Sequence, residues 1–118
     1  MTVDVRPSET ECERTIVEAA RMLGYLVHGS RPATSQKGWR TPLKGDRGFP
    51  DLVICGHGHC FMVELKRKPN RIEPAQQAWF DVLTAAGIDV RVVWVPEQQQ
   101  QFIDTLAEHT RPAAVSRR

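Results

Sequence analysis

The sequence predicts an α/β domain in which a mixed sheet of about four strands is flanked by helices. Three observations lead to this fold class. Apolar residues recur at helical spacing near the start of the chain, two strand-like runs are joined by a short glycine-containing connection, and a later apolar run lies between two further helical segments. At 118 residues the chain has the size of one domain, residues 1–118, and we expect 1–8 and 110–118 to be flexible ends.

The first predicted element is a helix from about Glu9 to Leu23. Its apolar positions recur at helical spacing and are Cys12, Ile16, Ala19, Ala20 and Leu23. Ser8 is a suitable N-cap, and Glu11, three residues later, completes a capping-box pattern. Gly24 is a natural stop for the helix, and the run 25–28 that follows is predicted to be a short strand.

A long loop and a hairpin are predicted next. Residues 29–48 have no sustained period and contain several prolines and glycines, which is typical of a loop. A loop of this length inside a compact domain is usually functional or disordered. The runs 51–55 and 60–66 predict two strands, and the short connection Gly56–His59 indicates that they form an antiparallel hairpin.

Two helices and one strand complete the predicted order. Residues 73–86 have helical spacing, Pro74 is acceptable in the first turn, and Gly87 ends the helix. The nearly all-apolar run 90–95 predicts a strand that is buried on both faces. A third helix is predicted over 97–108.

The expected compartment is the cytoplasm. No apolar run approaches the roughly 20 residues of a membrane span, and the first seven residues lack the apolar region of a signal peptide. In a reducing compartment Cys12, Cys55 and Cys60 would remain thiols. The two cysteines and two histidines between positions 55 and 60 do not predict a zinc site, because strong zinc motifs use two separated pairs of ligands.

Local charge is more informative than the total. The formal net charge is only +2, but residues 31–47 and 66–71 both contain an excess of basic side chains. Such an excess attracts polyanions even when the whole chain is nearly neutral. Solvated basic loops explain the charge pattern equally well when it is taken alone.

The residues with the clearest chemical meaning are Asp51, Glu64 and Lys66. Side chains alternate across a strand, so Glu64 and Lys66 share one face while Leu65 points into the core. Antiparallel pairing brings Asp51, at the start of the first hairpin strand, beside the end of the second strand. Two carboxylates and a lysine would then meet, although the sequence leaves the register open.

Phosphodiester hydrolysis requires such groups. Two carboxylates can hold Mg²⁺ or Mn²⁺ through oxygen ligation, and the ion polarises the phosphate and helps to generate hydroxide. A lysine can orient or deprotonate the attacking water or stabilise the transition state. The alternative is that Glu64 and Lys66 are neighbours on an exposed strand face and that Asp51 caps a turn.

The pattern Asp…Glu-x-Lys on a hairpin resembles the PD-(D/E)XK nuclease superfamily, and the fuller pattern resembles its virus-type replication-repair (VRR-NUC) branch, especially small stand-alone phage proteins. The resemblance runs from Glu11 to about Trp94. Its motifs in order are ECERTI (11–16), RMLGY (21–25), GWRTP (38–42), GFPDL (48–52), ELK (64–66), QQAW (76–79) and AG (86–87). Several motifs in the right order are far more specific than any one of them.

The resemblance implies a restriction-endonuclease-like αβββαβ core and a divalent-metal-dependent DNA endonuclease. It implies that Asp51 and Glu64 bind Mg²⁺ or Mn²⁺, with the backbone carbonyl of Leu65 as a further ligand. It also implies that Lys66 is the catalytic lysine.

Two further site residues follow from the same resemblance. Gln76 matches the active-site glutamine, and we choose it over Gln77 because it lies three residues before Trp79. Glu11 matches the additional acidic residue of the first helix. Many relatives have glutamine where this chain has Glu13, which leaves open which of the two glutamates faces the metal.

DNA is the expected partner. The best candidates for phosphate contacts are the long-loop residues Arg31, Lys37, Arg40 and Lys44. Trp39 is a candidate for stacking on a base, with packing as an equal alternative. Phe49 is expected to pack beside the active site and to orient Pro50 and Asp51, whereas the helical spacing of Trp79 with Val82 and Leu83 predicts a core position.

Similarity to stand-alone members implies a homodimer that cuts branched DNA such as four-way junctions. A DNA-binding module that recognises structure without cutting is the alternative from another functional class. It is disfavoured because Asp51, Glu64, Lys66 and Gln76 are all retained. A restriction-type nuclease is disfavoured because the chain has no room for a separate base-reading domain.

Overall fold

A computed structural model describes residues 4–29 and 44–112 of the chain. The elements in order are α1 (Glu9–Met22), β1 (Leu26–Gly29), β2 (Leu52–Gly56), β3 (His59–Lys66), α2 (Pro74–Ala85), β4 (Asp89–Trp94) and α3 (Gln99–His109). The predicted α/β class and the predicted order of elements are therefore confirmed. No helix in these ranges is long and apolar enough to cross a membrane.

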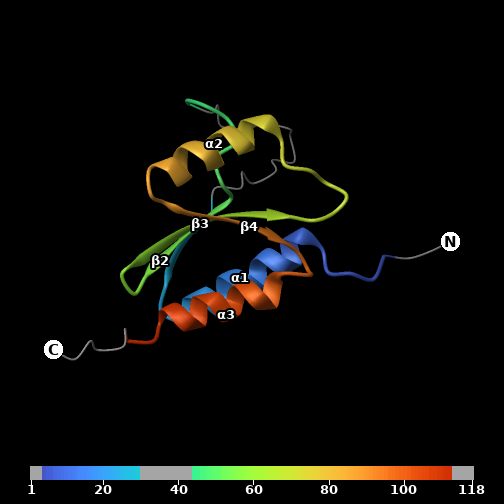
Figure 1. Ribbon diagram of the computed structural model, residues 1–118. Coiled ribbons are helices and arrows are strands. Elements are labelled where there is room, and N and C mark those ends of the chain that lie inside the picture. Colours follow the sequence, from blue (N-terminus) through green and yellow to red (C-terminus); the bar gives the residue numbers. More distant parts are fainter. Residues whose placement is uncertain (1–3, 30–43, 113–118) are drawn as a thin grey trace.

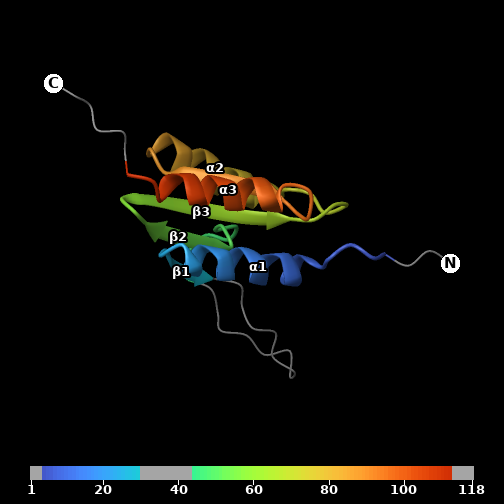
Figure 2. The same cartoon turned by 90° about the horizontal axis from the view of Figure 1, so that it is seen from below.

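The four strands form one mixed sheet in the order β1-β2-β3-β4. β1 pairs with β2 and β2 with β3 in antiparallel fashion, whereas β3 and β4 are parallel. α2 connects the parallel pair and covers one face of the sheet, while α1 and α3 pack against each other on the opposite face (Figure 1). Figure 2 shows from below that α1 lies next to β1, the edge strand farthest from β4.

The hydrophobic core lies between the sheet and the pair α1–α3. The odd-numbered residues Phe61, Val63 and Leu65 of β3 are buried there together with Ile16 of α1 and Leu106 of α3. Because side chains alternate across a strand, the even-numbered residues of β3 face α2 instead. This alternation places two polar side chains at the end of β3 under α2.

The hairpin between β2 and β3 has the predicted antiparallel form. Its turn residues His57 and Gly58 both have positive φ, 53° and 75°, as the tight turns of two-residue hairpins require. The register places Cys55 directly opposite Cys60, with their Cα atoms 4.1 Å apart, and the two form a disulfide. Our expectation that both remain thiols is therefore wrong, because it considered the compartment and not this pairing.

Cys12 is a free cysteine in the core, and burial raises the pKa of its thiol.

The prediction for β4 also needs correction. Of the predicted run 90–95, Val93 and Val95 are buried on one face, whereas Val90, Val92 and Trp94 on the other face are only partly buried, although we expected burial on both faces. The reason is that β4 is an edge strand, and Arg91 keeps its guanidinium partly exposed while it pairs with Asp89 at 2.7 Å.

Candidate active site

The candidate active site lies where β2 begins and β3 ends, on the face of the sheet that α2 covers. The hairpin register pairs Leu52 with Val63, so Asp51, one residue before β2, lies opposite Glu64. The Asp51 Oδ2 atom accepts a hydrogen bond from the backbone amide of Leu65 at 3.3 Å. The structure thus resolves the register that the sequence leaves open and brings the two carboxylates together.

Glu64 and Lys66 are buried, with exposed fractions of 3% and 9%. The Lys66 Nζ atom lies 4.0 Å from the Glu64 Oε2 atom. Charged residues are seldom buried unless they are paired or bind a charged group. The alternative of two neighbours on an exposed strand face is therefore wrong.

Gln76 links α2 to this pair. Its Nε2 atom donates a hydrogen bond to Glu64 Oε2 at 3.0 Å, and its Oε1 atom accepts one from the Glu73 backbone amide at 2.9 Å. The second bond belongs to the capping box of α2. Because Glu73 requires an acceptor, the amide of Gln76 is turned so that its donor faces the carboxylate.

This geometry yields a prediction that separates two adjacent glutamines. Gln76→Ala should reduce the proposed DNA cleavage about ten-fold or more, because Glu64 loses the donor that orients it. Gln77→Ala is the matched control, since Gln77 is exposed and its amide donates to Asp81, on the same helix, at 2.9 Å. Steady-state cleavage rates of both variants measure the difference, and equal rates would show that Gln76 has no role in the site.

Burial raises the pKa of Glu64 to about 8, and the negative charge of Asp51 adds to this effect while Lys66 opposes it. The Glu64 Oε1 atom is buried and has no hydrogen-bond partner in the described part of the chain. A buried carboxylate oxygen without a donor is unfavourable unless a cation or a proton compensates it. Glu64 therefore needs either a proton or a cation beyond Lys66 to compensate its charge.

The donor set fits a hard divalent cation. Two carboxylates, from Asp51 and Glu64, and the backbone carbonyl of Leu65 are oxygen ligands of the kind that Mg²⁺ and Mn²⁺ prefer. Within residues 4–29 and 44–112 no group of three or more histidine, cysteine, aspartate or glutamate side chains could hold a metal ion. The fit thus depends on the two carboxylates and the unpartnered Oε1 atom of Glu64.

The backbone before Asp51 is held against the first turn of α2. Gly48 has φ +98°, and a Cβ atom there would lie 2.5 Å from the backbone of Ala75 and 2.8 Å from the nitrogen of Gln76. Only glycine allows this close approach together with a positive φ. Pro50 follows and is fully buried. The motif Gly48–Asp51 thereby fixes one carboxylate relative to the helix that orients the other.

Gly48→Ala should destabilise the protein by roughly 2–4 kcal/mol, because strain at positive φ adds to a steric clash with backbone atoms. Gly87→Ala is the matched control, since Gly87 has a similar φ of +85° and a Cβ atom there would meet nothing within 4 Å among the described residues. Urea denaturation of the two variants measures the difference. A loss at Gly48 no larger than that at Gly87 would mean that the contact with α2 has no structural weight.

The other predicted site residues are more dispersed. Glu11 is exposed, and its carboxylate accepts a 2.8 Å hydrogen bond from the Ser8 amide in the N-terminal cap of α1. Glu13 is partly buried on the same helix, and a metal role for either glutamate stays a prediction. Lys44 is exposed, as a phosphate contact would be. The remaining predicted DNA contacts, Arg31, Lys37, Trp39 and Arg40, lie outside the described residues.

The predicted core position of Trp79 is wrong. Gln76, Phe80 and Leu83 form the stripe of α2 that faces the sheet, and Phe80 is the residue of α2 that is fully buried. Trp79 lies on the neighbouring stripe, one helical step away, and is only partly buried. Phe49 packs edge-on against the Trp79 ring at 5.0 Å between centroids. Phe49 therefore packs on Trp79, a residue that we predicted to lie in the core.

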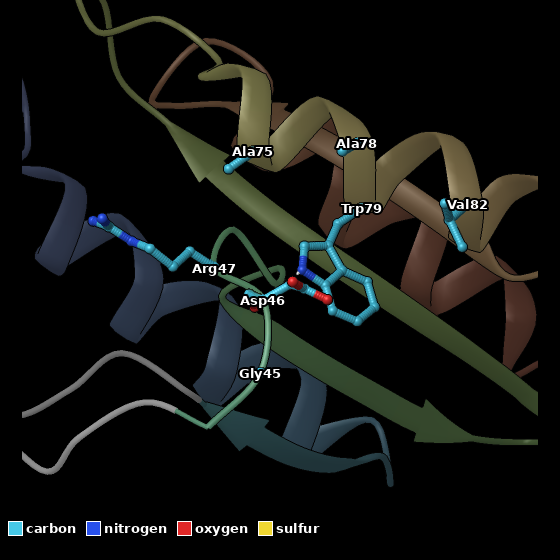
Figure 3. Close-up of a pocket in the computed structure, with 7 residues that line it drawn as sticks. All are labelled: Gly45, Asp46, Arg47, Ala75, Ala78, Trp79 and Val82. Carbon is cyan, nitrogen blue, oxygen red and sulfur yellow. Dashed lines mark hydrogen bonds between the residues drawn. The ribbon is translucent and has the colours of Figure 1, made fainter.

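Trp79 also lines a pocket that the sequence analysis did not predict. The pocket has a volume of about 570 Å³ and lies between α2 and the segment that leads to Asp51 (Figure 3). Its lining residues are Gly45, Asp46, Arg47, Ala75, Ala78, Trp79 and Val82. The signal in the sequence is the helical spacing of Trp79 with Val82, from which we predicted a core position for Trp79.

Comparisons with known proteins agree with this geometry. A family model described as the VRR-NUC domain matches residues 21–97, more than half of the chain. The matched range contains the whole stretch from Asp51 to Gln76 but not Glu11.

One solved structure, described as a VRR_NUC domain, matches with a TM-score of 0.61 and 24% sequence identity, covering 81% of this chain and 94% of that chain. At this identity the likeness supports the fold alone. No curated protein matches the sequence. On the strength of the family match, the chain belongs to the VRR-NUC domain family, which implies a nuclease-type DNA-processing function.

Proposed function

We propose that the chain is a divalent-metal-dependent endodeoxyribonuclease that hydrolyses phosphodiester bonds. The observation that carries this proposal is the buried Glu64 carboxylate, whose Oε1 atom has no hydrogen-bond partner in the described ranges although Asp51 and Lys66 lie beside it. Ionisation of this buried cluster is unfavourable in the absence of a cation, because the two carboxylates would repel each other. The cluster is useful where a cation and a phosphate must be held together.

The proposed roles follow from the contacts. Asp51, Glu64 and the backbone carbonyl of Leu65 would hold Mg²⁺ or Mn²⁺, which when bound polarises the scissile phosphate and promotes formation of hydroxide. Lys66 lies next to Glu64 and is buried, so its ammonium can orient the attacking water and stabilise developing negative charge. Gln76 keeps Glu64 in the orientation that its ligand role requires.

Branched DNA, such as four-way junctions, is the proposed substrate, and a homodimer is the proposed assembly. Two opposed strands can be cut in concert only by two active centres, which a dimer supplies. Exposed basic residues lie on both sides of the site in sequence, with Lys44 and Arg47 before it and Lys68 and Arg71 after it. These cations can contact phosphates of more than one duplex arm.

The test is a cleavage assay with labelled four-way-junction, flap, single-stranded and duplex DNA in the presence of Mg²⁺, Mn²⁺ or EDTA. We expect cleavage with either ion, none with EDTA, and loss of cleavage in Glu64→Ala. Faster cleavage of the junction than of the duplex would support the proposed substrate. Tight binding without cleavage in any condition would instead favour a DNA-binding module that does not cut.

A further inference from the structure

None of the catalytic roles described above uses the pocket beside α2. One wall is formed by α2 and contains the small or exposed apolar residues Ala75, Ala78 and Val82. Val82 is 63% exposed. The opposite wall is the backbone of residues 45–47 (Figure 3). An apolar pocket of this size, with a few polar groups at its edge, is typical of a ligand site.

The aromatic wall of the pocket is held in place. The Trp79 Nε1 atom donates a hydrogen bond to the backbone carbonyl of Asp46 at 3.3 Å. The edge of Phe49 packs against the indole ring with an interplanar angle of 88°. Gly48 anchors the same segment on α2 through its close approach to Ala75. The ring is therefore fixed before any ligand arrives, which lowers the entropy lost on binding.

Both walls of the pocket lead along the chain to residues of the candidate active site, although none of these residues lines the pocket itself. Ala75, in the pocket wall, precedes Gln76, whose amide bonds Glu64. On the other side, the segment 45–47 leads through Gly48 to Asp51. Both walls of the pocket therefore belong to chain segments that also position active-site residues.

We propose that this pocket binds one unpaired nucleobase of the DNA strand that is cut, an inference that rests on the proposed nuclease function. The partly buried indole of Trp79 supplies a stacking surface, which every base can use. Asp46 lies beside the indole, and its carboxylate is a suitable acceptor for the exocyclic amino group of cytosine, adenine or guanine.

Charge distinguishes a nucleotide from other occupants. Lys44 and Arg47 are exposed cations on the same short segment, and the Arg47 side chain extends to the side of the segment away from the indole (Figure 3). A nucleotide fits both the apolar pocket and these cations, since its base is flat and weakly polar while its phosphate is anionic. A second copy of this chain would need a surface complementary to this concave and charged edge.

A base that is stacked and paired within a duplex cannot enter such a pocket. Entry requires a base that is flipped out of the helix or already unpaired, and the energy of unpairing is smallest at a branch point, flap or single strand. The pocket therefore gives a physical reason for a preference for DNA with unpaired nucleotides next to the scissile phosphate.

The test measures binding of a short fluorescein-labelled single strand in EDTA by anisotropy. Val82→Glu places a negative charge at the pocket mouth without touching the core, and we expect it to weaken binding about ten-fold. Met22→Glu is the matched control, because Met22 is 88% exposed and lies on α1, on the opposite face of the sheet. Trp79→Ala should weaken binding to a similar extent, with circular dichroism to verify its fold.

An abasic scan of the strand identifies the occupant. We expect an abasic nucleotide at one position to weaken binding of the wild type but to have no further effect on Val82→Glu, since both changes remove the same contact. Unchanged binding by Val82→Glu would overturn the proposal. A loss of binding accompanied by a fall in mass in analytical ultracentrifugation would also overturn it and assign the pocket to a second copy of the chain.

These experiments distinguish failure of the proposed nuclease function from failure of the proposed nucleobase site. If metal-dependent cleavage is observed and Val82→Glu binds normally, the nuclease stands and the pocket has no role in it. If no DNA is cut but the abasic position and Val82→Glu weaken binding without additivity, the nuclease fails and the nucleobase site is supported.

Discussion

Lys66→Met is expected to reduce cleavage at saturating metal by at least about a hundred-fold, because a positioned lysine that acts on the attacking water or the transition state contributes effects of this size. Methionine matches the lysine side chain as far as Cε and lacks the ammonium group, so most of the buried position stays filled. Asp51→Asn should have an effect at least as large, since it removes one of the two proposed metal-binding carboxylates. Single-turnover cleavage rates with Mg²⁺ and Mn²⁺ measure both losses.

Each of these variants has a control in the same chain. Arg21→Met changes an exposed basic residue on α1, on the face of the sheet opposite α2, and Asp104→Asn changes an exposed aspartate on α3 that accepts a hydrogen bond from Gln100. Both controls should cleave within about two-fold of the wild type, and all four proteins should bind labelled junction DNA in EDTA. Normal cleavage by Lys66→Met would remove Lys66 from the reaction and leave it as a structural partner of Glu64.

Much of the fold could be predicted because local signals agreed with one another. The capping box of Ser8 and Glu11 is present at the start of α1, with the Glu11 amide donating to the Ser8 hydroxyl at 3.1 Å. Gly24 and Gly87 follow the ends of α1 and α2 and both have positive φ. Such turn and cap residues act within a few positions of the chain, so a single sequence contains the information.

The errors arose where distant segments decide the environment. Whether Trp79 or Phe80 faces the core depends on the rotation of α2 about its axis, which packing on β4 and the segment 45–49 determines. The burial of β4 depends on its edge position in the sheet. Neither of these environments is a local property of the sequence. The disulfide between Cys55 and Cys60 is the exception, because the two cysteines are five residues apart in the predicted hairpin and we considered only the compartment.

The candidate site, like the fold, could be predicted only in part from the sequence. Strand alternation predicted that Glu64 and Lys66 share a face, and both lie on the face that α2 covers. The contact with Gln76 and the depth of burial could not be predicted from spacing, because they depend on how the first turn of α2 meets the sheet. The bond from Gln76 to Glu64 in turn relies on the cap at Glu73, which links helix formation to the site.

Glu64→Gln should stabilise the metal-free protein at alkaline pH. The folded-state pKa of Glu64 is about 8, above its ordinary value of 4.5, because burial and Asp51 disfavour the charged form. The stabilising contribution of the protonated carboxyl is therefore complete below pH 4.5 and is lost as the pH rises through 8. Glutamine does not ionise, and its oxygen can still accept the hydrogen bond from Gln76.

The difference in unfolding free energy between Glu64→Gln and wild type should grow between pH 5 and pH 9 and reach on the order of a few kcal/mol. Urea denaturation in EDTA measures it, and Glu108→Gln, at an exposed position of α3, is the control that should show no such trend. Addition of Mg²⁺ or Mn²⁺ should stabilise the wild type at pH 8 but not Glu64→Gln, because an ion that binds the folded state through Glu64 raises its stability. A variant that gained no stability at high pH would show that the charge of Glu64 does not destabilise the protein. A variant that kept the full response to metal would show that Glu64 is not a ligand of the ion. Together, the two measurements show whether Glu64 is a buried carboxylate without a ligand role or one that binds a cation.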